Sequence, residues 1–329
     1  MRRDRRSFLL AAGVLLAAAC ARGARAGQGM ARVAVLATAS RTALVVRRMD
    51  ELFGALAKAG WVEGRNLRTD WRWAEGNPSR LAPLAAELVA LNPDVIIAST
   101  QPAATAAMKA TKTIPIVFVI VPEPIESGLA ESLARPGRNA TGLASMNKEL
   151  IGKRVDLLRE AFPGTRRIAL LFEPEFDMNV RQAALAEQAA RTLGLEVARV
   201  GIGQPPTYDA AFETLARERP DAVLVIENPS VFTNRAEIVK RMAKARLRAM
   251  YGFGDFVLEG GLMSYSANHL DQYRRAADYV DRILRGAKPG DLPIQQPLKF
   301  ELSVNLRSAK ALGIAIPQSI LLRADRVLE

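Results

Sequence analysis

Short, nearly continuous apolar runs alternate along the chain with longer segments whose apolar residues recur at helical spacing. The apolar runs cover residues 33–37, 95–98, 116–120, 168–172, 197–200 and 223–226. Runs of this kind are typical of strands that are covered on both faces. The helical segments cover residues 45–59, 80–91, 148–161, 180–193 and 236–246. This alternation predicts right-handed βαβ units, parallel sheets and therefore an α/β fold.

The pattern divides into two similar halves, with a turn-rich stretch (RPGRNATG) at residues 135–142 between them. A chain of 329 residues is also longer than one compact core usually holds. We therefore expect two doubly wound parallel-sheet lobes joined by a hinge, with a chain that returns to each lobe. The expected N-terminal lobe comprises residues 27–145 and about 266–290, including a helix at 272–285; the C-terminal lobe comprises 146–265 and about 291–329, including a strand at 299–304.

The first 26 residues have the layout of a secretory signal peptide. A basic opening precedes an apolar run at 8–20, and small residues end at Ala26. That run is shorter than the ~20 residues that cross a bilayer. Arg5 and Arg6 also give the segment twin-arginine character, so the general and the twin-arginine export routes both remain open. We expect cleavage after Ala26 and a periplasmic protein; lipid attachment at Cys20 is the alternative, and the expected cleavage would remove that cysteine.

The formal charge of +12 overstates how basic the exported chain is. Residues 1–26 contain six arginines and one aspartate, which leaves 40 basic and 33 acidic residues in the remainder. Those basic residues are dispersed among acidic and apolar ones, and no helix-turn-helix or similar motif precedes the α/β region. We expect a solvated basic surface and no nucleic-acid partner.

Candidate ligand contacts follow from the rule that α/β sheets bind ligands beyond the carboxyl ends of their strands. In the first lobe these positions hold Ser40, Ser99, Thr100, Gln101 and Glu123. Ser99 and Thr100 precede a predicted helix, where they would help to bind an anionic group or simply cap the helix. Glu123, held between two prolines, would suit a ligand amine or belong to a surface turn.

In the second lobe the corresponding positions hold Asn179, Asn228, Tyr251 and Asp255. Acids and aromatic rings together would suit an amphiphilic ligand. Two neighbours of these residues, Asp177 and Ser230, stand where helix N-caps are expected, so a structural role is the simpler interpretation for them.

Signatures of catalysis are sparse. His269 is the chain's only histidine, and its place just before a predicted helix indicates a surface or capping residue. One histidine supports neither a nucleophilic triad nor a histidine metal cluster. The sequence contains no GxSxG elbow, no phosphate-binding GxxxxGK[ST] loop and no GxGxxG after a strand. We expect a protein that is not an enzyme and needs no cofactor or metal.

Several motifs, taken in order, resemble those of the ABC-transporter substrate-binding proteins of the tryptophan/tyrosine-importer-like group. They are residues 60–66 (GWVEGRN), 71–76 (WRWAEG), 114–119 (IPIVFV), 135–142 (RPGRNATG), 260–265 (GGLMSY), 305–306 (NL) and 309–313 (AKALG). The resemblance covers essentially the whole chain. It implies a type I periplasmic-binding fold, hinge closure on a small ligand, no cofactor, and docking onto a permease with a separate ATPase.

The sequence departs from this group at expected contacts. Ser99-Thr100-Gln101 replaces a segment that is often small and glycine-rich, Pro122-Glu123-Pro124 replaces Gly-Asp-Pro, and Gly252-Phe253-Gly254 replaces an acidic and aromatic pattern. Ligand identity therefore does not carry over, although an amino acid or a related amphiphile is expected. We expect a monomeric importer subunit; the alternative is a periplasmic sensing subunit for a signalling receptor.

Overall fold

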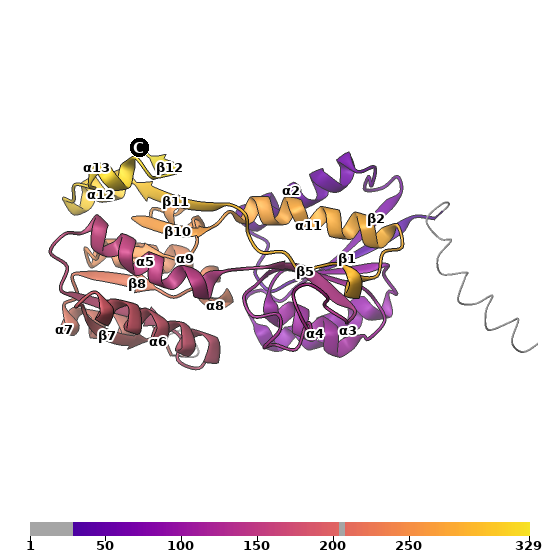
Figure 1. Ribbon diagram of the computed structural model, residues 1–329, viewed down its shortest axis with the longest axis horizontal. Coiled ribbons are helices and arrows are strands. Elements are labelled where there is room, and N and C mark those ends of the chain that lie inside the picture. Colours follow the sequence, from indigo (N-terminus) through magenta and orange to yellow (C-terminus); the bar gives the residue numbers. More distant parts are fainter. Residues whose placement is uncertain (1–28, 204–207) are drawn as a thin grey trace, which may run out of the picture.

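Strands flanked by helices form two sheets, one in each of two lobes that lie side by side (Figure 1). The computed structural model describes residues 29–203 and 208–329, so the predicted signal peptide and Cys20 lie outside the described residues. In this part of the chain the first-lobe sheet has five parallel strands in the order β2-β1-β3-β4-β5. They are β1 (Ala31–Ala37), β2 (Leu67–Trp73), β3 (Val95–Ala98), β4 (Ile116–Val121) and β5 (Ala140–Ala144).

The sheet of the second lobe has the order β12-β11-β10-β9-β8-β6-β7. Its strands are β6 (Arg167–Phe172), β7 (Glu196–Gly201), β8 (Ala222–Val225), β9 (Ala249–Tyr251), β10 (Met263–Ala267), β11 (Phe300–Asn305) and β12 (Arg326–Leu328). The pairing is parallel except between β10 and β11, which run antiparallel. The strand predicted at 299–304 therefore forms, but it enters its sheet in the opposite direction from the one expected.

Helices cover both faces of each sheet. The first lobe contains α2 (Ala43–Lys58), α3 (Leu81–Ala90), α4 (Gln101–Ala110) and α11 (His269–Leu284). The second contains α5 (Asn147–Ala161), α6 (Asp177–Thr192), α7 (Tyr208–Glu218), α8 (Pro229–Thr233), α9 (Arg235–Lys244), α10 (Asp255–Leu258), α12 (Leu306–Leu312) and α13 (Gln318–Leu321). Short 3-10 turns lie at Pro78–Arg80 and Pro289–Asp291. Among the residues described, no helix is both long enough and apolar enough to cross a membrane.

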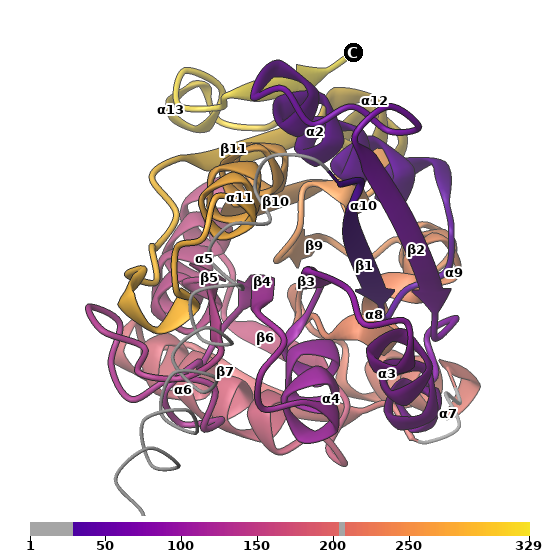
Figure 2. The ribbon, with the colours of Figure 1, turned by 90° about the vertical axis from the view of Figure 1, so that its right-hand side faces the viewer.

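Strand β1 illustrates why its apolar run is nearly continuous. Successive side chains of a strand point to opposite faces, so both faces must be apolar when helices cover both. Val33 and Val35 pack into the core formed with α2 and α11, whereas Ala34 and Leu36 pack into the core formed with α3 and α4. Figure 2 shows these two helix pairs on opposite sides of the first-lobe sheet.

The chain passes between the lobes at three places in the described structure: between β5 and α5, between β10 and α11, and between the turn at Pro289–Asp291 and β11. Helix α11 packs along α2 in the first lobe, although the strands before and after it belong to the second (Figure 1). Two lobes joined by three connecting segments can rotate against each other about a hinge at those segments.

Three local predictions were wrong. Helix α6 begins at Asp177 itself with no side-chain cap, and the cap of α8 is Asn228, whose Oδ1 accepts from the Val231 amide at 2.8 Å, rather than Ser230. His269 is neither a surface residue nor a cap, since it is buried as the first residue of α11 and Asn268 caps that helix.

Candidate ligand-binding site

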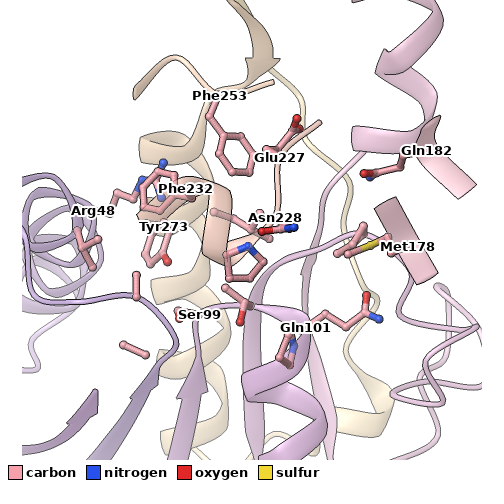
Figure 3. Close-up of a pocket in the computed structure, with 18 residues that line it drawn as sticks. Arg48, Ser99, Gln101, Met178, Gln182, Glu227, Asn228, Phe232, Phe253 and Tyr273 are labelled. Atoms are coloured by element: carbon pink, nitrogen blue, oxygen red, sulfur yellow. The ribbon is translucent and has the colours of Figure 1, made fainter. Parts of the chain in front are cut away.

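A pocket lies between the lobes, where the carboxyl ends of strands from both sheets face each other (Figure 3). The first lobe lines it with Ala37, Ala39, Val45, Arg48, Ser99, Thr100, Gln101, Pro102, Ile120, Pro122 and Tyr273. The second lobe lines it with Met178, Gln182, Glu227, Asn228, Pro229, Phe232 and Phe253. Most of these side chains are apolar, and a few polar groups converge among them, as is usual for small-molecule sites.

The first lobe contributes hydroxyl and amide groups at the start of α4. Thr100 caps this helix: its hydroxyl accepts from the Ala103 amide at 3.5 Å and lies 2.6 Å from the Thr38 hydroxyl. The Ser99 hydroxyl accepts from the Thr38 amide at 3.3 Å. Oε1 of Gln101 accepts a hydrogen bond from the backbone amide of Glu123 at 3.4 Å. The side-chain nitrogen of Gln101 is left available for another partner. A helix N-terminus with these donors favours an anionic or carbonyl group.

Strand β4 ends at the pocket in an irregular way. Ile120 has a φ of +59°, and the pairing of β4 with β5 shifts between Phe118 and Val121. A β-branched residue in the left-handed backbone conformation is strained by about 1–3 kcal/mol. This conformation persists only where the surrounding structure holds it. The irregularity brings Ile120 and Pro122 to the pocket lining.

The second lobe contributes an aromatic wall. Phe232 and Phe253 meet edge to face, with ring centroids 5.7 Å apart, and Phe253 meets the His269 ring at 4.7 Å. The guanidinium carbon atoms of Arg48 and Arg235 lie 4.8 and 4.9 Å from the centroid of the Phe232 ring. These contacts hold the ring of Phe232 in place and leave an apolar surface toward the pocket.

Behind this wall lies a buried charged cluster that joins the lobes. Arg48 of α2 forms an ion pair with Asp255 of α10 and donates to Nδ1 of His269 at 3.0 Å. Burial lowers the pKa of His269 to about 4, since desolvation and the nearby Arg48 outweigh the attraction of Asp255. Burial alone would raise the pKa of Asp255, but Arg48 and His269 together bring it down to about 2. The cluster therefore contains ionised Arg48 and Asp255 beside a neutral imidazole.

A second buried ion pair lies within the second lobe. Glu227 Oε1 lies 3.0 Å from Nη1 of Arg154, and both side chains are 2% exposed. Arg154 also donates to the carbonyls of Tyr265 at 2.8 Å and Gly252 at 3.1 Å. The Glu227 carboxylate packs against the Cα of Gly252, where any side chain would overlap it: a Cβ there would come within 1.8 Å.

Comparison with known proteins identifies the fold and the family. The family model described as ABC transporter substrate binding protein matches residues 32–328. The chain belongs to the ABC transporter substrate-binding protein family. It is 25% identical over 262 residues to a tyrosine-binding protein from Clostridioides difficile, across 79% of this chain and 74% of that protein.

Two solved structures resemble this binding protein over most of its length. A conserved domain protein from Vibrio cholerae is 28% identical with a TM-score of 0.82, and the match covers 91% of this chain and 99% of that one. An ABC domain in complex with L-Trp from Streptococcus pneumoniae is 25% identical with the same TM-score of 0.82 and the same coverage of 91% and 99%. The predicted family and the type I periplasmic-binding fold are thus confirmed.

Four of the nine predicted contacts line the pocket of this binding protein: Ser99, Thr100, Gln101 and Asn228. Asn228 donates to Glu173 at 3.0 Å and to Asn179 at 2.7 Å, so its amide group is fixed while it also caps α8. Whether these four residues touch a ligand stays a prediction.

The other five predicted contacts lie outside the lining. Ser40 precedes α2, and Asn179 is buried behind the pocket, where its side chain contacts Asn228. Tyr251 is in the core, stacked on Phe256 with centroids 4.7 Å apart.

Glu123 and Asp255, also among those five, both form ion pairs between the lobes. Glu123 pairs with Arg181 of α6 at 2.6 Å, and Asp255 pairs with Arg48. Each carboxylate is thus already engaged by an arginine of the opposite lobe.

The pocket also contains residues that the sequence pattern did not single out. Arg48, Tyr273 and Gln182 lie inside helices rather than after strands, and Phe232 lies in the short helix α8. A polar Arg48 on the otherwise apolar buried face of α2 is a signal that could have been noticed. Within the described ranges, no cluster of three or more His, Cys, Asp or Glu side chains could hold a metal ion.

Proposed function

We propose that this protein is an exported solute-binding subunit of an ABC importer that captures an aromatic amino acid, or a related amphiphile, by closure of its two lobes. The observation that carries the proposal is the composition of the pocket between the lobes. The aromatic wall of Phe232 and Phe253 faces hydroxyls, an amide and a helix N-terminus from the first lobe. An apolar ring would pack against the wall, and a carboxylate would face Ser99, Thr100 and the start of α4.

The comparisons support this class of ligand. One relative is named a tyrosine-binding protein, and one similar structure holds L-Trp. The chain has its own residues at the expected contacts, and a screen of ligands therefore identifies the particular amino acid. The ligand would be released unchanged to a membrane permease that works with a separate ATPase; we do not propose catalysis.

The proposal that the protein is exported is based on its N-terminal segment. Removal of residues 1–26 as a signal peptide would place a monomeric protein in the periplasm, where it would meet both solute and permease.

A thermal-shift screen on residues 27–329, unfolded and refolded to remove ligand carried over from expression, tests the proposal. The panel would hold the twenty amino acids, purines, small carboxylates and short peptides. A ligand at 100 times its dissociation constant adds about 2.7 kcal/mol to the free energy of unfolding, which gives a clear rise in melting temperature. We expect hits among the aromatic amino acids, recovered unchanged after incubation. Hits confined to purines or peptides, or conversion of the ligand, would contradict the proposal.

A further inference from the structure

The imidazole of His269 is enclosed by side chains from both lobes. His269 is the first residue of α11, directly after the crossover that follows β10. Arg48 of α2 approaches it from the first lobe, whereas Phe253 and Asp255 approach it from the second. The ring of Phe253 meets the imidazole edge to face at a centroid distance of 4.7 Å, and Oδ2 of Asp255 lies 3.9 Å from Nδ1. Opening of the cleft therefore uncovers the imidazole.

The contact with Arg48 fixes the protonation state of His269 in the closed arrangement. Nη2 of Arg48 donates to Nδ1 at 3.0 Å, so Nδ1 is an acceptor and the neutral ring carries its proton on Nε2. A second proton would have to enter on Nδ1, opposite a guanidinium N–H. Two donors and two positive charges would then face each other across this contact, and Arg48 cannot lose its own proton. A protonated His269 is therefore incompatible with the position of Arg48.

The position of Arg48 also determines the contact between the lobes. The same Nη2 atom forms the buried ion pair with Asp255 of the second lobe. The side chains of Arg48 and Asp255 are 7% and 10% exposed, so water screens their charges only weakly. Arg235 of α9 adds a further positive charge near Asp255. Displacement of Arg48 by a protonated His269 would therefore break an ion pair that holds the lobes together.

The other charged groups around His269 also oppose its protonation. Burial has the largest effect, and together with the positive charges of Arg48 and of Arg154 on α5 it lowers the pKa of His269 to about 4, although Asp255 attracts the proton. Tyr273, one turn further along α11, stays neutral because burial raises its pKa to about 12. In the open form water reaches the imidazole, and its pKa returns toward the ordinary value of 6.5.

We propose that Arg48, Asp255 and His269 form a proton-sensitive latch, which holds the cleft closed while His269 is neutral and opens when His269 is protonated. The proposal goes beyond solute capture but rests on the proposed closure of the lobes around a solute. Closure excludes a proton, so the closed form is favoured above pH 6.5 and loses this advantage as the pH falls toward 4. The protein would then capture solute at neutral pH and release it on mild acidification. In protein that saturating ligand holds closed, the same exclusion lowers the free energy of unfolding instead.

Calorimetric titration with L-tryptophan, L-tyrosine and L-phenylalanine at pH 7 and pH 5 tests the latch. The ionisation of these ligands does not change between the two pH values. We expect the wild-type protein to bind about 10- to 30-fold more weakly at pH 5. His269→Gln keeps an acceptor for Arg48 but does not titrate, so its affinity should change less than about threefold over the same range. An equal loss of affinity in both proteins, or no loss in the wild type, would overturn the proposal.

A matched control and a measurement on the wild-type protein complete the test. Asp271→Asn removes an acid of the same helix outside the pocket lining and should respond to pH as the wild type does. If His269→Gln fails to fold, titrations of the wild type in buffers of different ionisation enthalpy count the protons. Binding should release about one proton per ligand at pH 5.5 and none at pH 8, and no release at pH 5.5 would overturn the latch.

Failure of the latch can be told apart from failure of the proposed cargo. Binding at pH 7 with the same affinity at pH 5 would contradict the latch and leave solute capture standing. No binding of the three amino acids at pH 7 would contradict the aromatic cargo. The comparison of the wild type with His269→Gln is then made with the compound of the thermal-shift panel that raises the melting temperature most, and the same two outcomes decide it.

Discussion

Arg181 of helix α6 donates to Oε2 of Glu123 at 2.6 Å, so an ion pair joins the two lobes next to the pocket. Glu123 lies between Pro122 and Pro124 after β4, and its side chain is 9% exposed, whereas that of Arg181 is 54% exposed. The prolines fix the backbone and present the carboxylate to the opposite lobe. Because the partners belong to different lobes, opening of the cleft must separate them.

This ion pair predicts a slower release of ligand than the pocket contacts alone would give. Glu123→Gln should raise the dissociation rate about two- to fivefold, since a half-exposed pair is worth only about 0.2–1 kcal/mol. Stopped-flow measurements of ligand release would detect the change, and high salt should reduce it. The exchanged pair Glu123→Arg with Arg181→Glu should restore slow release. A dissociation rate that is unchanged in Glu123→Gln would show that the pair does not stabilise the closed form.

The hydroxyls at the start of α4 should contribute to affinity as well as to the helix cap. The double variant Ser99→Ala and Thr100→Ala should weaken ligand binding about tenfold, because each neutral hydrogen bond contributes about 0.5–1.5 kcal/mol. It should also lower the free energy of unfolding by about 1 kcal/mol through loss of the cap. Thr42→Ala, which removes the cap of α2 outside the pocket lining, should show a similar stability loss with unchanged affinity. Unchanged affinity in the double variant would assign these hydroxyls to capping alone.

The chain's only histidine predicts a specific loss of stability at mildly acidic pH. In the folded protein the pKa of His269 is lowered to about 4 from an ordinary 6.5, so between these values the unfolded chain binds a proton that the folded chain does not. Stability contributed by neutral His269 is therefore present above pH 6.5 and is lost as the pH falls toward 4. The free energy of unfolding should drop by about 2 kcal/mol between pH 7 and pH 5.

Urea unfolding of the wild-type protein and of His269→Gln at pH 7 and pH 5 isolates this effect, because carboxylates that titrate nearby are common to both proteins. The slope with pH should flatten in His269→Gln, whatever its absolute stability. Identical slopes in the two proteins would mean that His269 is protonated as easily in the folded state as in the unfolded one.

The buried pair of Arg154 and Glu227 predicts a large effect on stability when only the cation is removed. Arg154→Met would leave a buried carboxylate without its counter-charge, which typically costs about 3–5 kcal/mol. Adding Glu227→Gln to Arg154→Met should recover part of this loss, because the uncompensated charge is gone. Thermal and urea unfolding of both variants measure the difference. A double variant less stable than Arg154→Met alone would contradict this electrostatic explanation.

The sequence predicted the strands and helices of the sheet interiors well because burial on both faces imposes continuous apolar runs, as in β3 at Val95–Ala98. It missed β2 (Leu67–Trp73), because this edge strand mixes Arg and Asp with Trp and Leu and has no apolar run. The antiparallel entry of β11 was also missed, because its run is compatible with either direction and the choice depends on a crossover between lobes.

The pocket was predicted only in part. Positions after strands are found from the order of elements alone, which is how Ser99 and Asn228 were found. Arg48 and Phe232 reach the pocket through the packing of helices across two lobes, and no local pattern encodes that packing. The acids Glu123 and Asp255 were expected to face a ligand, whereas arginines from the opposite lobe pair with them. Such pairings become visible only when both lobes are in place.

The central claim, that a small solute binds between the lobes, is tested most directly by a crystal structure of residues 27–329 with either L-tryptophan or L-tyrosine, whichever raises the melting temperature more. We predict ligand density enclosed between Ser99 of the first lobe and Phe232 of the second. A ligand bound on an outer face of either lobe, with the pocket between them empty, would contradict the account.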